Sequence, residues 1–208
     1  MHLLDELRAE HELIERAVGS LQAFAADAAR TAADGEAFLK FFRLYAGRFH
    51  HAREEDTLFP ALVRETGAPA DRGPLKVVLE AHHAMAHLLD EMAPLLAQGG
   101  DVADLAARYG RSLLHHIDAE NSVLYPESET RLRRAGIREL PDRAPDADED
   151  AARAEMEELL AKYPPREIPD LIRGEGCVSC EAYGEGCDGV EREWWTELEW
   201  EDVHHRIG

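Results

Sequence analysis

Apolar residues recur every three or four positions along most of residues 1 to 136, and no stretch alternates strictly between apolar and polar positions. This spacing is typical of helices with one buried face and predicts no strand. Glycine and proline cluster at "AADGEAF", "TGAPADRGP" and "AQGGD", which divide the region into four helical segments of roughly 25 to 35 residues. Short loops between long helices predict an all-α fold, an antiparallel up-and-down four-helix bundle.

Two of these segments carry the same apolar stripe at an offset of 71 residues. Steps of three and four place all members of a stripe on one helix face, so the histidine in the middle of each stripe should face the core. The matched pairs are Leu4 and Leu75, Leu7 and Val78, His11 and His82, Ile14 and Met85, Val18 and Leu89, and Leu21 and Met92. We expect His83 and His87 on the surface, although a register one residue later would bring them inward to replace or join His82.

The other two segments repeat a motif at an offset of 66 residues, as "HHAREEDTLFP" and "HIDAENSVLYP". The alignment superimposes His50 on His116 and Glu54 on Glu120, whereas His51 falls opposite an isoleucine. A spacing of four places the histidine and the glutamate on one helix face, about one turn apart, which is metal-chelating geometry. The leucine, aromatic residue and proline that follow are expected to cap the core and bend the chain, without chemistry of their own.

Six side chains that can bind metals should therefore converge inside the bundle. They are His11, His50, Glu54, His82, His116 and Glu120. Burying them without compensation would be costly, and cations would supply that compensation. Six ligands exceed one tetrahedral site and suit two metal ions bridged by carboxylates. Nitrogen and oxygen donors fit iron, manganese or zinc, and open positions would remain for water, dioxygen, nitric oxide or peroxide.

With these segments the sequence resembles the hemerythrin-like, HHE cation-binding family over residues 1 to about 135. The resemblance is carried by "EHELIERAV", "FHHAREEDTLFP", "LEAHHAMAHLL" and "HHIDAENSVLYP". It implies a four-helix bundle that holds a non-haem di-iron centre of the Fe–O–Fe type, with two bridging carboxylates. It also implies roles for the six residues: His11, His50, His82 and His116 as terminal ligands, and Glu54 and Glu120 as bridges.

Two features differ from the oxygen-carrying members of that family. Those proteins have a fifth histidine four residues after the one on the third helix, where this chain has Ala86. They also end the fourth helix with H-x-x-x-x-D, where this chain has Glu120 at a spacing of four. Both features make the chain similar to the branch associated with iron-centre repair and with the response to oxygen and nitric oxide, so reversible oxygen carriage is less expected.

Charge excludes some classes of partner. The chain has 43 acidic and 23 basic residues and a formal net charge of -20, so we expect neither nucleic acid nor a membrane surface as a partner. The first residues carry charges every few positions and lack an uninterrupted apolar core, which makes the cytoplasm the expected location.

The composition of the sequence changes after Gly136, where acidic residues and prolines become frequent. We expect the bundle to occupy residues 1–136 and an acidic C-terminal extension to occupy residues 137–208, with at most one short helix. A solvated, extended segment packed along the bundle is the favoured interpretation, and a surface for a protein partner is the alternative. A homodimer also stays open.

A cysteine cluster, "GEGCVSCEAYGEGCDG", lies in this extension. Cys177, Cys180 and Cys187 could form a zinc site with His204, or hold an iron-sulfur cluster with another ligand. A dithiol that exchanges with a disulfide and ordinary reduced cysteines are the other interpretations.

The leading hypothesis is a cytoplasmic di-iron protein that binds or reacts with dioxygen, peroxide or nitric oxide, or handles iron in a stress response. Whether it is an enzyme stays open. The alternative is an iron or oxygen sensor, or an interaction module, that signals through the C-terminal tail. A helical scaffold without metal is the third hypothesis.

Overall fold

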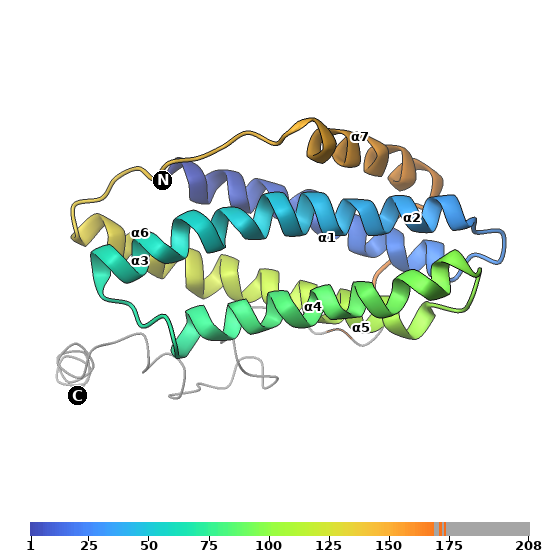
Figure 1. The fold of residues 1–208 in the computed structure, drawn as a ribbon, viewed down its shortest axis with the longest axis horizontal. Helices are drawn as coiled ribbons and strands as arrows, with labels where there is room; N and C mark the ends of the chain where they lie inside the picture. Colours follow the sequence, from blue (N-terminus) through green and yellow to red (C-terminus); the bar gives the residue numbers. More distant parts are fainter. Residues whose placement is uncertain (169–170, 172, 174–208) are drawn as a thin grey trace.

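The computed structural model describes residues 1–168, 171 and 173, and this part of the chain is helical without strands, as predicted (Figure 1). Three short elements are π-helical and are labelled η. The elements in order are α1 (His2–Ala25), α2 (Ala32–Lys40), η1 (Phe41–His51), η2 (Glu54–Leu58), α3 (Phe59–Thr66), α4 (Gly73–Ala97), α5 (Ala103–Ala119), η3 (Glu120–Leu124), α6 (Tyr125–Arg134) and α7 (Ala147–Lys162). The candidate second site at Cys177, Cys180, Cys187 and His204 lies outside the described residues.

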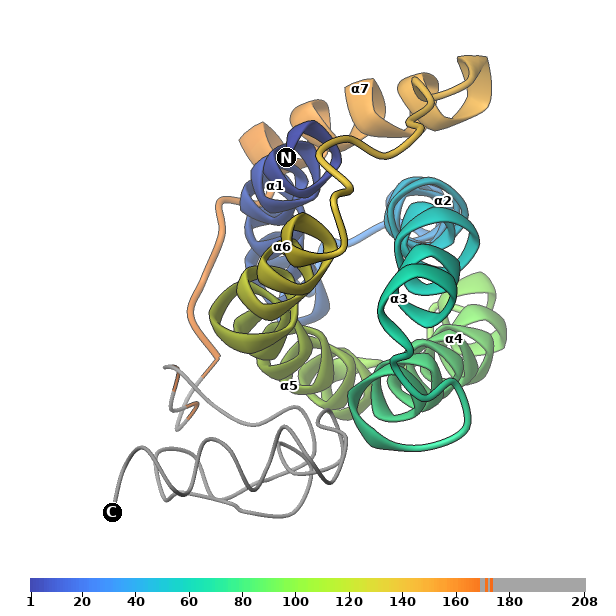
Figure 2. The same cartoon turned by 90° about the vertical axis from the view of Figure 1, so that its left-hand side faces the viewer.

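The helices pack side by side into a bundle. The α2 helix continues through η1 and η2 into α3, and α5 continues through η3 into α6 (Figure 2). The α1 and α4 helices both contact α5, while α2 and η1 contact α4. Within the described part, no helix combines the length and the apolar character that crossing a membrane requires.

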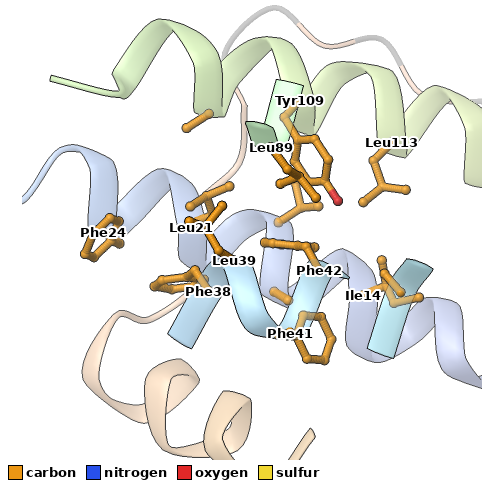
Figure 3. Close-up of a cluster of buried hydrophobic side chains, with 14 of the residues drawn as sticks. Ile14, Leu21, Phe24, Phe38, Leu39, Phe41, Phe42, Leu89, Tyr109 and Leu113 are labelled. Atoms are coloured by element: carbon orange, nitrogen blue, oxygen red, sulfur yellow. The ribbon is translucent and has the colours of Figure 1, made fainter. Parts of the chain in front are cut away.

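The repeated apolar stripes of α1 and α4 face the core as predicted, because all twelve matched positions are buried. The apolar core consists of two separate clusters. The larger one contains Ile14 and Met85 and is partly shown in Figure 3, and the smaller one contains Leu7 and Val78. Each stripe histidine lies in sequence between these residues, so the histidines form a polar layer between the two clusters.

The repeated motif folds into matching π-helical turns. The backbone N–H of Phe59 donates to the carbonyl of Glu54, and that of Tyr125 donates to the carbonyl of Glu120, five residues back in both cases. The proline that follows each aromatic residue has no N–H, and its ring clashes with the carbonyl four residues earlier in a regular helix. A wider turn accommodates the ring, and such turns are frequent at functional sites.

The first helix break lies earlier than the glycine pattern predicts. The α1 helix ends at Ala25, and Thr31 caps α2 by accepting a hydrogen bond from the backbone N–H of Asp34. Gly35 is therefore inside a helix rather than in the loop. It allows close packing, because a Cβ atom there would come within 2.9 Å of Leu96 Cδ2 and would require that side chain to move.

The apolar core does not end at residue 136. The α7 helix packs along η1 and also contacts α1 and α2 (Figure 2). Met156, Leu159 and Leu160 join the larger apolar cluster. Asp146 and Glu149 form a capping box that starts this helix. The one helix expected in this region is present and packs along the bundle. It is not a solvated, extended segment, because its apolar side chains are buried in the core.

Candidate metal centre

The six side chains predicted to converge lie together in the polar layer between the two apolar clusters. Glu54 and Glu120 have an exposed fraction of 0%, and the four histidines are buried. The possible ligand atoms form two groups, within each of which all atoms lie within 4.8 Å of one another. One group is His51, Glu54, His82 and His116, and the other is His11, His50 and Glu120.

Glu120 lies between the two groups. Its Oε1 atom is 3.0 Å from His116 Nε2, and its Oε2 atom is 3.3 Å from His11 Nε2. Glu54 Oε2 lies 3.5 Å from His82 Nε2, and Glu120 Oε1 lies 3.9 Å from the same nitrogen. Glu120 therefore directs one carboxylate oxygen at each of the two groups.

His51 belongs to the centre, contrary to the alignment that placed it opposite an isoleucine. Its ring stacks on His82 with a centroid distance of 3.8 Å and an interplanar angle of 9°. Both His50 and His51 are buried at the end of η1. A π-helical turn contains more residues than an α-helical turn, so adjacent residues differ less in direction and both can face the interior. His83 and His87 are exposed, as expected.

Three buried carboxylate oxygens, Glu54 Oε2, Glu120 Oε1 and Glu120 Oε2, make no well-directed hydrogen bond, although an imidazole nitrogen lies 3.0–3.5 Å from each of them. A buried charged atom without a partner is strongly destabilising. Five imidazoles surround these oxygens, and imidazole nitrogen with carboxylate oxygen is a donor set that iron, manganese and zinc accept. The residues present therefore fit bound metal, which would satisfy these oxygens.

The electrostatic environment favours metal-binding protonation states. Burial lowers the pKa of His50 to about 4, and burial together with His82 and His116 lowers the pKa of His51 well below its usual value. Burial opposes ionisation of Glu120, yet His116 and His11 hold its pKa well below the usual range. Metal ligands must be neutral imidazoles and ionised carboxylates, so these shifts favour the metal-binding forms of His50, His51 and Glu120.

Glu54 behaves differently from Glu120. Burial and the negative charge of Glu120 raise the pKa of Glu54 well above its usual value. Two carboxylates this close cannot both ionise easily without a cation. The metal-free centre therefore carries a penalty that a bound cation would remove.

Three histidines of the centre have an outer hydrogen-bond partner that the sequence reasoning missed. Such partners fix the ring orientation and the tautomer of a ligating histidine. The contacts are His50 Nδ1 to Glu10 Oε2 at 2.8 Å, His82 Nδ1 to Glu55 Oε1 at 2.6 Å, and His11 Nδ1 to Asn121 Oδ1 at 3.0 Å. Each partner directly neighbours a predicted ligand in the sequence, and that adjacency is the signal that could have revealed it.

Tyr125 contacts the centre, although no chemistry was expected of the aromatic position in the motif. Its hydroxyl donates a hydrogen bond to Glu54 Oε1 at 2.6 Å, and its ring stacks on His11 at 5.6 Å. Phe59 holds the same motif position and has no hydroxyl. The presence of tyrosine in one repeat and phenylalanine in the other is the feature of the sequence that could have indicated this contact.

Comparison with known proteins gives a family match. The family described as Hemerythrin HHE cation binding domain matches residues 2–128. All seven histidines and glutamates of the centre lie inside this span, whereas α7 lies outside it. No curated protein and no solved structure matches the chain.

Proposed function

This chain belongs to the hemerythrin HHE cation-binding family, and we propose that it holds two iron ions and binds or reacts with dioxygen, peroxide or nitric oxide. The observation that supports this most directly is the set of three unpaired carboxylate oxygens enclosed by five imidazoles. Bound iron would supply a redox-active Lewis acid with coordination positions open to such molecules.

The chain's own residues hold and shield the centre. The five histidines and Glu54 and Glu120 supply the donor atoms, and the Tyr125 hydroxyl fixes the orientation of Glu54. Leu58 and Leu124, both with an exposed fraction of 0%, lie one helical turn beyond the two glutamates and keep water away from them. We propose that residues 1–136 carry this reactive centre and that residues 137–208 act as an extension on it.

His51 changes one argument about which branch of the family the chain resembles. Because this residue supplies a fifth imidazole, the alanine at position 86 no longer argues against oxygen binding. The spacing of four between His116 and Glu120 still resembles the branch associated with iron-centre repair and the nitric oxide response. We therefore propose reaction with peroxide or nitric oxide, or iron handling under such stress in the cytoplasm, rather than reversible oxygen carriage.

The test is iron loading followed by turnover. Full-length protein purified without oxygen and loaded with ferrous iron should retain about two irons per chain. Consumption of peroxide or nitric oxide should disappear in Glu54→Ala and Glu120→Ala. His83→Ala, which changes an exposed histidine on α4, should behave as wild type. Failure to retain iron, or unchanged consumption in both glutamate variants, would refute the proposal.

A contact between the extension and the bundle favours a sensor as the second candidate function. Arg173 donates hydrogen bonds to Glu15 Oε1 at 2.8 Å and Oε2 at 2.9 Å, and it also pairs with Asp118. Glu15 lies one turn from His11, and Asp118 lies two residues from His116. A change at the centre could thus reach the tail and a partner protein or second copy that binds it.

Limited proteolysis with and without oxidation of the iron-loaded protein tests the sensor. A cleavage pattern in the tail that changes on oxidation, with no consumption of peroxide or nitric oxide, would favour it. An unchanged pattern together with turnover would exclude it.

A further inference from the structure

A chain of charged contacts connects the centre to the segment that follows the bundle. His50 Nδ1 donates to Glu10 Oε2 at 2.8 Å, and Arg53 Nη1 donates to the other oxygen of Glu10. Arg53 Nε and Nη2 donate to the two oxygens of Asp142 at 2.7 and 3.0 Å. Glu10 and Arg53 are buried, with exposed fractions of 8% and 3%.

Asp142 lies in the connection between α6 and α7, beyond residue 128 where the family match ends. We propose that Glu10 is a positioning residue for His50, and that Asp142 holds Glu10 in place through Arg53. The extension would then help to set the metal affinity of the group formed by His11, His50 and Glu120. This inference rests on the proposed metal centre and assigns to the extension a part in building it.

Glu10 determines which nitrogen of His50 faces the centre. A carboxylate only accepts hydrogen bonds, so it selects the tautomer with the proton on Nδ1. The lone pair of Nε2 then faces the centre, where this atom lies within hydrogen-bonding distance of His11 Nε2, at 3.0 Å. Outer carboxylates of this kind fix ring orientation and raise the basicity of the ligand.

Arg53 is suited to hold two carboxylates at once. Its planar guanidinium presents donors in a fixed fork, which a lysine ammonium does not. The guanidinium carbon lies 4.4 Å from the centroid of the Phe49 ring, so the group is also held from one face. Glu10, Arg53 and Asp142 together line a cavity of about 830 Å³. A displacement of the extension would move Asp142 and thereby remove its hydrogen bonds with Arg53.

The arrangement is asymmetric between the two groups of ligands. In the other group, the outer partner of His82 is Glu55, which lies within residues 2–128. Within the part of the chain that the structure describes, the contact from Asp142 reaches a centre histidine through the Glu10 side only. We therefore expect a change at Asp142 to affect one of the two metal ions more than the other.

The experiment is a titration of full-length protein with cobalt(II) against a chromophoric chelator, which needs no turnover. Glu10→Gln should weaken one binding step by about 10- to 100-fold, because an amide offers its oxygen to only one of His50 and Arg53. Asp142→Asn should weaken the same step by a smaller factor. Glu155→Gln is the matched control, since it removes the 3.0 Å ion pair between α7 and Lys40 without touching these contacts.

A double-mutant cycle separates positioning from general stability. In an Arg53→Lys background, Asp142→Asn should cause no further loss, because its effect passes through Arg53. The visible spectrum of bound cobalt(II) should change in Glu10→Gln and Asp142→Asn but not in Glu155→Gln. Equal weakening of both binding steps, or an Asp142→Asn variant that matches Glu155→Gln, would overturn the inference. Wild-type protein that binds no cobalt(II) or zinc would instead overturn the proposed metal centre.

Discussion

Glu54→Gln should stabilise the metal-free protein and remove its stabilisation by metal. Glu54 is fully buried, and its Oε2 atom has no hydrogen-bond partner. Glutamine keeps an oxygen that can accept the hydrogen bond from Tyr125. It is neutral at every pH, so folding requires neither a second negative charge beside Glu120 nor the uptake of a proton. It cannot act as a bridging carboxylate. The same change should therefore raise the stability of the metal-free protein and lower the stability of the metal-bound protein.

The magnitude follows from the unpaired oxygen. A buried polar group without a partner costs about 1–3 kcal/mol, which is the expected gain in the free energy of unfolding of the metal-free variant. For a chain of this length that corresponds to roughly 2–12 °C in Tm. Metal at 1,000 times its Kd should stabilise the wild type by about 4.1 kcal/mol and the variant by much less. The order of the two stabilities should therefore reverse when metal is added.

The gain should also depend on pH. Because the pKa of Glu54 is raised in the folded state, the wild type suffers no penalty from this group below the unfolded value of 4.5. The penalty grows as pH rises from 4.5 through the folded value, since folding then holds a proton that the unfolded chain releases. The advantage of the metal-free glutamine variant should therefore increase with pH.

Thermal unfolding followed by circular dichroism, in chelator and in excess zinc, measures both effects. Glu149→Gln is the matched control, because Glu149 has an exposed fraction of 1% but accepts hydrogen bonds from Arg143 and Arg48. Its loss should destabilise the protein equally with and without metal. A Glu54→Gln variant that is less stable than wild type in chelator would refute the reasoning, because the carboxylate would then be stabilised by the protein itself.

Other substitutions test the fold and the centre independently. His51→Ala should weaken metal binding by at least about tenfold in a chelator competition. His83→Ala, which changes an exposed histidine, should leave the affinity unchanged. Equal affinities of the two variants would contradict the place of His51 in the centre. Hydrogen bonds from Arg143 and Arg48 lower the pKa of Glu149 to about 2. The contribution of Glu149 to stability should therefore be present above pH 4.5 and be lost as the pH falls toward 2. Acid unfolding of Glu149→Gln should lack this pH dependence. Gly110→Ala would place a Cβ atom 2.6 Å from Ile168 Cδ1 and 3.0 Å from both Val18 Cγ1 and Gln22 Nε2. This crowding from three sides should outweigh the gain in helix propensity and cost about 1–3 kcal/mol by denaturant unfolding, and a neutral effect would contradict the packing of Ile168 against Gly110.

The sequence determined the helical fold and the convergence of six polar side chains. Helical spacing is a local property, so a stripe such as Leu4, Leu7, His11 and Ile14 identifies the buried face before any neighbour is known. The internal repeat supports the same inference, because a motif that occurs twice predicts two helix faces that are buried in the same way. Glu54 and Glu120 are accordingly both buried and both lie within 4 Å of the same nitrogen of His82.

Other parts of the centre were decided only by the tertiary structure. A π-helical turn changes the direction of His51, and ideal α-helical periodicity cannot represent that change. The contact from Glu10 to Arg53 and on to Asp142 joins residues far apart in the chain, so no local pattern contains it. The docking of α7 likewise depends on its contacts with η1, α1 and α2, which come together only in the folded bundle. Periodicity fixes which face of a helix is buried, whereas the partner of that face and the exact direction of each side chain depend on packing between distant segments.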